Sequence, residues 1–154
     1  MKRILTRLLA PLLLLGWLPA QAMITGELIM VRSDRAFPDA MRILQGAIKK
    51  QGYTLSNIQP VDEALAKSGY TTDNYRIVFF GKTEQMKLLT RTHPELIPYL
   101  PLKIAIYAEA GETLLVTSDP AVFMDLYPDR QLHKVFMQWH EDLISIMKNL
   151  QNPD

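Results

Sequence analysis

The chain has 154 residues, of which 48% are hydrophobic and 21% charged, with 17 Lys and Arg against 16 Asp and Glu. This near-neutral balance excludes the strongly basic surface of a nucleic-acid-binding domain or of a protein held on anionic membranes. The sequence has no cysteine, which excludes disulfides, thiol nucleophiles, thiolate metal sites and the covalent attachment of c-type haem.

The first 22 residues predict a cleaved signal peptide. Lys2, Arg3 and Arg7 form a basic start, and an uncharged run of 15 positions (8–22) ends in the small-residue pattern A-x-A. This run contains Pro11 and is shorter than the roughly 20 apolar residues that a membrane-spanning helix needs. The sequence therefore predicts cleavage after residue 22, a periplasmic or secreted protein, and no stable membrane anchor after cleavage.

The mature chain, residues 23–154, has 132 residues and predicts a single domain with one core. Loss of the three basic leader residues leaves 14 Lys and Arg against 16 Asp and Glu, so the mature chain is slightly acidic. We therefore expect no nucleic-acid partner.

Apolar periodicity and turn residues predict secondary structure along the mature chain. The expected order is a strand at 24–33, a helix capped by Ser33 or Asp34 and closed at 49–52, a strand at 53–59, a short helix at 61–67, a strand at 74–81, a helix at 83–91, a β-hairpin around 109–112, a helical turn from 119 and a helix at 129–150.

This order predicts an α+β fold, with a largely antiparallel sheet, helices packed on one face and a long C-terminal helix. The apolar runs at 77–80 and 103–107 alternate too little for a sheet face that meets water. Because no second layer remains in the chain, we expect a homodimer with residues 98–103 or the terminal helix at its interface. In the competing arrangement, the terminal helix crosses over and covers that face within one chain.

The stretch from residue 76 to 120 carries an ordered set of short motifs. A strand ends in Phe80-Gly81, Pro94 follows, Leu100-Pro101-Leu102-Lys103 opens the next strand, and a hairpin leads to Ser118-Asp119-Pro120. In this order and spacing, residues 28–127 resemble the domain of unknown function 302 family. The chain departs from the family pattern at Lys82-Thr83, where Asn-Pro is usual. The resemblance implies a compact α+β domain, often dimeric, with no established activity and no site residues to transfer.

The terminal helix holds His133, Met137 and His140 along one boundary of its apolar face. His133 and Met137 are spaced i, i+4, and Met137 and His140 are spaced i, i+3, so either pair could bind one ion. The two histidines lie roughly 10.5 Å apart along the helix axis, so at most two of the three residues can bind at once. Copper suits such ligands in an exported protein. The alternative is that all three are half-buried packing residues.

Two further groups of residues are candidates. Pro98, Tyr99 and Lys103 could form the rim of a ligand cleft or of a dimer contact, or simply a structural lead-in to a strand. The adjacent carboxylates Asp62-Glu63 and Glu141-Asp142 are expected to be solvated, because neighbours on a helix point apart.

The sequence contains no G-x-S-x-G motif and no glycine-rich phosphate loop. Our leading hypothesis is therefore an exported, non-enzymatic domain that binds a small ligand or a partner. One alternative is a periplasmic protein that handles copper or haem through the histidine and methionine edge, and another is an unrecognised enzyme. The sequence assigns no cofactor.

Overall fold

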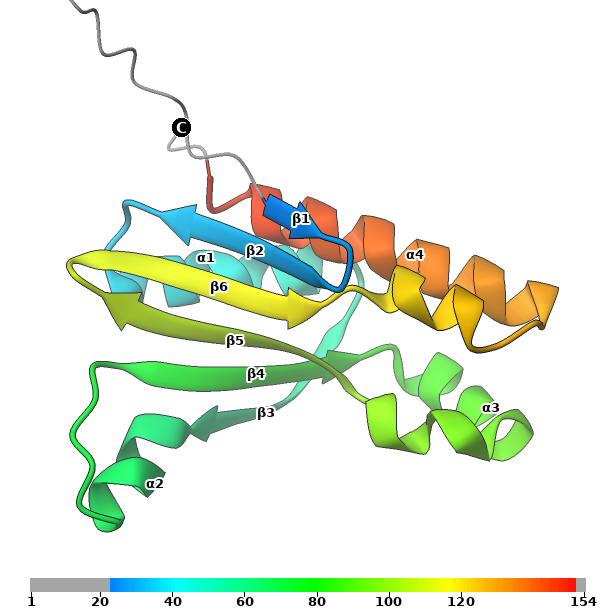
Figure 1. Cartoon of the computed structure of the whole chain (residues 1–154), viewed down its shortest axis with the longest axis horizontal. Coiled ribbons are helices and arrows are strands. Elements are labelled where there is room, and N and C mark those ends of the chain that lie inside the picture. Colours follow the sequence, from blue (N-terminus) through cyan, green and yellow to red (C-terminus); the bar gives the residue numbers. More distant parts are fainter. Residues whose placement is uncertain (1–22, 152–154) are drawn as a thin grey trace, which may run out of the picture.

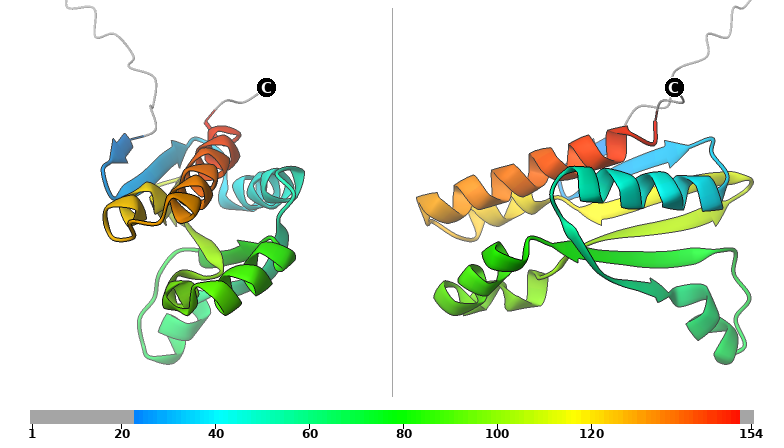
Figure 2. Two further views of the ribbon diagram at one scale, coloured as in Figure 1. Left: turned by 90° about the vertical axis from the view of Figure 1, so that its right-hand side faces the viewer. Right: turned by 180° about the vertical axis from the view of Figure 1, so that it is seen from behind.

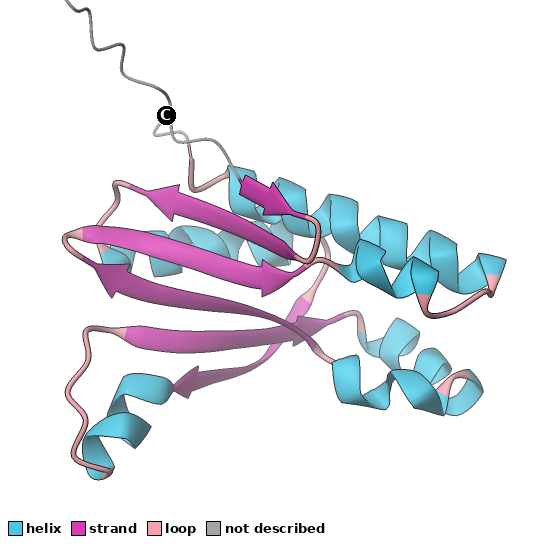
Figure 3. Ribbon diagram, in the orientation of Figure 1, coloured by secondary structure: helices cyan, strands magenta, loops and turns pink. Residues whose placement is uncertain are grey.

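The computed structural model describes residues 23–151, so the predicted signal peptide lies outside the described residues. Helices and strands are interspersed along the chain (Figure 3). Two of the helical segments, η1 and η2, are 3-10 helices. The elements are β1 (Met23–Thr25), β2 (Leu28–Ser33), α1 (Phe37–Lys50), β3 (Thr54–Pro60), α2 (Val61–Lys67), β4 (Tyr75–Gly81), α3 (Thr83–Thr92), η1 (Pro94–Tyr99), β5 (Leu102–Glu109), β6 (Glu112–Ser118), η2 (Pro120–Asp125) and α4 (Arg130–Lys148).

The strands form one six-stranded sheet in the order β1-β2-β6-β5-β4-β3, and every neighbouring pair is antiparallel (Figure 1). The predicted α+β class and antiparallel sheet are therefore confirmed. The β5–β6 hairpin turns through Ala110 and Gly111, whose φ angles of 53° and 88° lie in the left-handed region. Two such residues in succession match the twist of antiparallel strands.

The helices α1 and α4 pack on one face of the sheet and bury the core (Figure 2). Alternate strand residues point toward them, because successive side chains of a strand face opposite sides. The fully buried side chains on this side come from both layers. They include Ile29, Val31, Val78, Phe80, Ile104, Ile106 and Leu115 from the strands, and Leu44, Ile48, Phe136, Trp139, Leu143 and Ile146 from the helices.

No helix within residues 23–151 covers the opposite face of the sheet, which we call the open face (Figures 1 and 2). By strand alternation and register, its central residues are Leu28, Met30 and Arg32 on β2, Leu114, Val116 and Ser118 on β6, Lys103, Ala105 and Tyr107 on β5, and Tyr75, Ile77 and Phe79 on β4. The arrangement in which the terminal helix covers this face is wrong, because α4 lies beside α1 on the other side.

The helix caps differ in part from expectation. Neither Ser33 nor Asp34 caps α1, whose N-cap is Ala36 and makes no side-chain hydrogen bond. Ser33 instead donates its hydroxyl to the carbonyl of Leu150 at 2.8 Å, which ties the turn after α4 to β2. Asp129 caps α4, accepting from the backbone N–H of Gln131 at 2.6 Å.

Among the residues that the structure describes, no helix combines the length and the apolar character needed to cross a bilayer.

Candidate functional site

The structure brings Pro98, Tyr99 and Lys103 to the wall of one hollow, of about 70 Å³, together with Ser118 and Phe123. The first two residues end η1, Lys103 is the second residue of β5, and Ser118 ends β6. The ring of Tyr99 lies 4.4 Å, centroid to centroid, from the ring of Phe123 and remains 40% exposed. The three residues singled out in the sequence therefore surround a common space.

A second hollow, of about 160 Å³, adjoins the first on the open face. The two hollows share Lys103, Thr117 and Ser118, which we call the junction. Beyond the junction, the second hollow is lined by the apolar side chains of Leu28, Ile77, Ala105 and Val116. An aromatic recess and an aliphatic strip thus meet at one lysine and one exposed hydroxyl.

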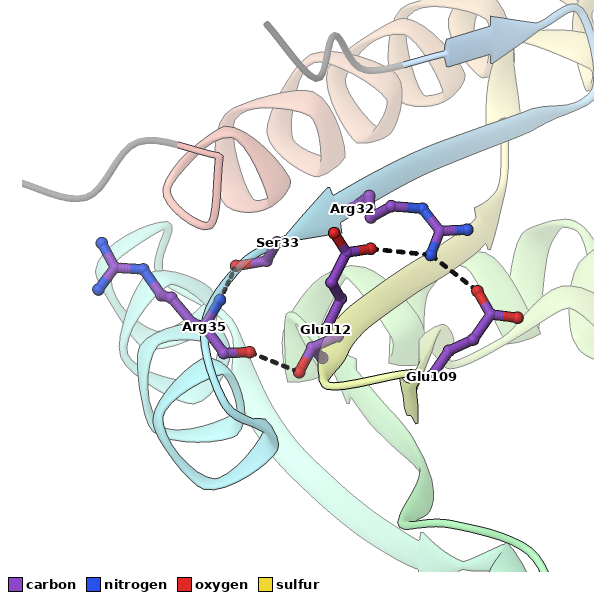
Figure 4. A network of polar contacts seen from close by, with 6 residues as sticks. Arg32, Ser33, Arg35, Glu109 and Glu112 are labelled. Carbon is purple, nitrogen blue, oxygen red and sulfur yellow. Dashed lines mark hydrogen bonds and ion pairs between the residues drawn. The ribbon is translucent and has the colours of Figure 1, made fainter. Parts of the chain in front are cut away.

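The two central cations of the open face differ in their partners. Arg32 contacts two carboxylates, Glu109 at 2.7 Å and Glu112 at 3.1 Å, and these contacts raise its pKa (Figure 4). Lys103 forms no ion pair with any residue of the described range 23–151. One end of the open face therefore carries a surplus carboxylate, while the other end carries an uncompensated ammonium group.

A second polar cluster lies inside the helix layer, around Asp142. This carboxylate is 7% exposed and accepts hydrogen bonds from Tyr53 Oη at 2.7 Å, Lys82 Nζ at 3.1 Å and Gln138 Nε2 at 2.9 Å. The ammonium of Lys82 also lies 4.5 Å from the centre of the Tyr53 ring, in cation–π contact. Burial, followed by the hydrogen bond to Asp142, raises the pKa of Tyr53 well above its usual range.

The expectation that Asp142 is solvated is wrong, and so is that for Asp62, which forms a part-buried ion pair with Arg76. In the Asp142 cluster, each donor has an acceptor, and the neighbouring space between Tyr53, Lys82 and Trp139 has no room for water. A satisfied network without an opening stabilises the fold and leaves nothing for a ligand to bind.

The histidines of α4 are held by contacts of different kinds. Nε2 of His133 donates to the carbonyl of Tyr127 at 2.6 Å, and Nδ1 of His140 donates to the carboxylate of Asp119 at 2.7 Å. Because both partners are acceptors, the other ring nitrogens, Nδ1 of His133 and Nε2 of His140, are the ones that can offer a lone pair to a metal. Met137, which lies between them in sequence, is 36% exposed.

The structure does not assemble these residues into a metal centre with a carboxylate. Within residues 23–151, no three His, Cys, Asp or Glu side chains lie together in a way that could hold an ion. The contact between His140 and Asp119 is nevertheless the arrangement that orients a ligating imidazole, because Asp119 is 3% exposed and fixes the ring.

Sequence reasoning missed both the Asp142 cluster and the pairing of Asp119 with His140. The partners of Asp142 stand up to 89 positions away, so no local spacing connects them. One weak signal was available, since Asp142 lies at the edge of the apolar face of its helix, where a carboxylate needs a buried partner.

The model of the family described as "Domain of unknown function DUF302" matches residues 29–150. A crystal structure of an uncharacterized conserved DUF302 protein from Bacillus stearothermophilus is similar, with a TM-score of 0.71 and 16% sequence identity. The similarity covers 80% of this chain and 97% of that chain and, at this identity, shows a common fold. No protein with a curated description matches the chain. The family resemblance of the sequence is confirmed, and the chain belongs to the DUF302 family.

Proposed function

We propose that the mature chain is an exported, non-enzymatic binding domain that takes a small apolar ligand at the junction of its two hollows. One observation carries this proposal: an uncovered, largely apolar sheet face runs into a hollow whose wall holds Tyr99, Phe123 and Lys103. Exposed apolar surface that continues into a recess with a few polar groups is typical of binding sites.

The dimensions restrict how such a ligand binds. The hollows measure about 70 and 160 Å³, below the roughly 300–1,000 Å³ of an enclosed small-molecule pocket. A ligand therefore lies along the surface, with one side on the strip of Ile77, Ala105 and Val116 and the other side toward water or toward a second chain.

A second copy of the chain is the partner that we propose for the rest of the open face. Pairing two open faces about a two-fold axis covers the apolar strands on both chains with one type of contact. Light scattering on the mature protein at micromolar concentration should give the dimer mass. A monomer mass would reject the pairing and leave the ligand proposal standing.

Binding is tested by thermal shift with a panel of small apolar metabolites, followed by variants on the best ligand. Tyr99→Ala should abolish the ligand-induced shift because it removes the exposed ring of the recess. Tyr70→Ala is the matched control, since Tyr70 is 68% exposed and does not line either hollow. Equal loss in both variants, or metal-free turnover of any panel compound, would contradict the proposal.

Export is tested by mass spectrometry of the periplasmic fraction. The mature protein should begin at Met23, as the leader pattern of the sequence predicts. Full-length protein recovered from the cytosol would reject this part of the proposal.

Metal or haem handling at His140 is a second candidate, favoured by the contact of its Nδ1 with the buried carboxylate of Asp119. This contact leaves Nε2 as the atom that can bind a metal, with Met137 as the neighbour on the helix. Titration calorimetry with Cu(I), Cu(II) and Zn(II), and spectroscopy with haem, should show binding that His140→Ala removes and His93→Ala retains. Binding that survives loss of all three histidines would reject this site.

A further inference from the structure

We infer that the ligand of the open face is an anionic amphiphile, with its charged head at Lys103 and Ser118 and an unbranched apolar chain along β5. This inference rests on the proposed function and adds the chemical class of the ligand. It follows from the contrast between the two cations of the face, from the small side chain at its centre and from the acidic group at its far end.

The charge of the head follows from the partners of Arg32 and Lys103. Arg32 is neutralised by Glu109 and Glu112, whereas Lys103 has no carboxylate partner among the described residues and stands at the junction of both hollows. An ammonium group on an apolar surface favours an anion, because the low polarity around it strengthens the attraction. The exposed hydroxyl of Ser118 adds a hydrogen-bond donor beside it.

The path of the chain follows from the register of the strands. Ala105 lies between Ile77 on β4 and Val116 on β6, so a small side chain is flanked by two larger ones. The hollow of about 160 Å³ includes this position and has the volume of about five water molecules, at ~30 Å³ each. Such a notch fits a chain of methylene groups.

The direction and the length of the chain follow from what lies beyond Ala105. The next residue of β5 on this face is Tyr107, and the acidic group of Glu109 and Glu112 comes after it. An anionic head is repelled from that end, so the head must bind at Lys103. The four residue steps from Lys103 to Tyr107 give the chain a path of roughly 13 Å.

The test uses titration calorimetry to compare ligands with chains of equal length, added to the mature protein. Ligand concentrations are kept below those at which the ligands form micelles. Octanoate and octyl sulfate carry a charged head group and octanol a neutral one, so their affinities separate the contribution of the charge from that of the chain. Octanoate and octyl sulfate also distinguish a carboxylate head from a sulfate or phosphate head. We expect at least one anion to bind ten-fold or more tightly than octanol. From hexanoate to decanoate, affinity should rise about two-fold per methylene until the chain reaches Tyr107, because only one side of each methylene is buried on the strip.

Variants then assign the binding to its atoms. Lys103→Met should weaken binding of the anion ten-fold or more, while Lys103→Arg retains it. Lys134→Met, an equal change of charge on the exposed side of α4, should leave binding unchanged. Ala105→Leu fills the notch and should flatten the dependence on chain length.

The contrary outcomes are distinct. Equal affinity for octanol, with no effect of Lys103→Met, overturns the anionic head and leaves apolar binding intact. No binding of these probes, while the metabolite panel yields another ligand at the Tyr99 recess, overturns only the present inference. If neither the octyl probes nor any compound of the metabolite panel binds, the proposed function is overturned as well. If Lys103→Met converts a dimer to a monomer and no probe binds, the whole open face is an interface with a second copy. That result also overturns the present inference.

Discussion

Two lysines lie near the same end of neighbouring strands and face opposite sides of the sheet. Lys82 follows β4 and points into the helix layer, where Asp142, 3.1 Å away, and the Tyr53 ring, 4.5 Å away, both contact it. Lys103 stands at the beginning of β5, paired in register with Phe79, and has no charged partner among the described residues. The same side chain is therefore a structural link on one face and an available binding group on the other.

This contrast extends to the layers around the two residues. On the helix side, the space beside Lys82 admits no water, and the carboxylate of Asp142 has three donors. On the open side, two hollows meet at Lys103, and apolar side chains lie uncovered beyond it. The first region is complete within one chain, and the second is complete only with something from outside.

Removal of the Asp142 carboxylate should have the largest effect on stability. Asp142→Ala leaves the buried hydroxyl of Tyr53 without its acceptor and removes the partner of Lys82. We expect a loss of about 2–3 kcal/mol in the free energy of unfolding, measured by urea denaturation. Glu141→Ala, at the exposed neighbouring position, should change it by less than about 0.5 kcal/mol. Similar losses in both variants would contradict the distinction between the two carboxylates.

The buried hydroxyl of Tyr53 should make the native state sensitive to high pH. Its folded-state pKa is raised above the ordinary value of about 10, so the unfolded chain releases this proton first and stability falls as the pH passes that value. Tyr53→Phe should cost about 1–2 kcal/mol at pH 7. Above pH ~10, its stability should decline less steeply than that of the wild type, by about 1.4 kcal/mol per pH unit.

The exposed Tyr70 is the matched control for this pH dependence. Tyr70→Phe should keep the full alkaline slope in urea denaturation series, because its hydroxyl is accessible in the native state. If the free energy of unfolding of Tyr53→Phe declined with pH as steeply as that of the wild type, the hydroxyl of Tyr53 would not hold its proton more strongly in the folded state. That result would contradict the prediction.

The same substitution at the two lysines should give different results. Lys82→Met removes one of three donors from Asp142 and should cost about 1 kcal/mol, a modest loss because the Lys82 side chain is 35% exposed. Lys103→Met should stay within about 0.5 kcal/mol of the wild type, because the ammonium of Lys103 forms no ion pair with any residue in the described range that the substitution would break. Equal losses in the free energy of unfolding, measured by urea denaturation, would show that Lys103 is as structural as Lys82 and would reject the contrast between the two lysines.

Local patterns predict most elements of the fold, but they do not predict contacts between distant segments. The expected strand at 24–33 is instead two strands, β1 and β2, which pair as a hairpin. The apolar run at 77–80 and the turn at Ala110 and Gly111 carry their structure in neighbouring residues, so β4 and the hairpin follow from sequence. The sequence indicates a solvated Asp142, because adjacent carboxylates on a helix point apart. Its burial depends on Tyr53, which is 89 positions away.

The candidate site likewise divides into a part that local sequence patterns predict and a part that depends on the assembled sheet. A loop with proline and tyrosine before a central strand indicated a rim, and the structure places a hollow there. The register that aligns Ile77, Ala105 and Val116 across three strands is a property of the assembled sheet, so the aliphatic strip could not be located from the order of residues alone.

The most direct test of the central claim is a map of amide chemical shifts of the mature protein during titration with octanoate. We predict shifts confined to the strands that line the second hollow, β2, β4, β5 and β6, and to the segments η1 and η2 that border the junction, with the Asp142 cluster unchanged. Shifts centred on α4 and Lys82, or no shifts at all at saturating octanoate, would contradict the claim that the open face is the binding side of the molecule.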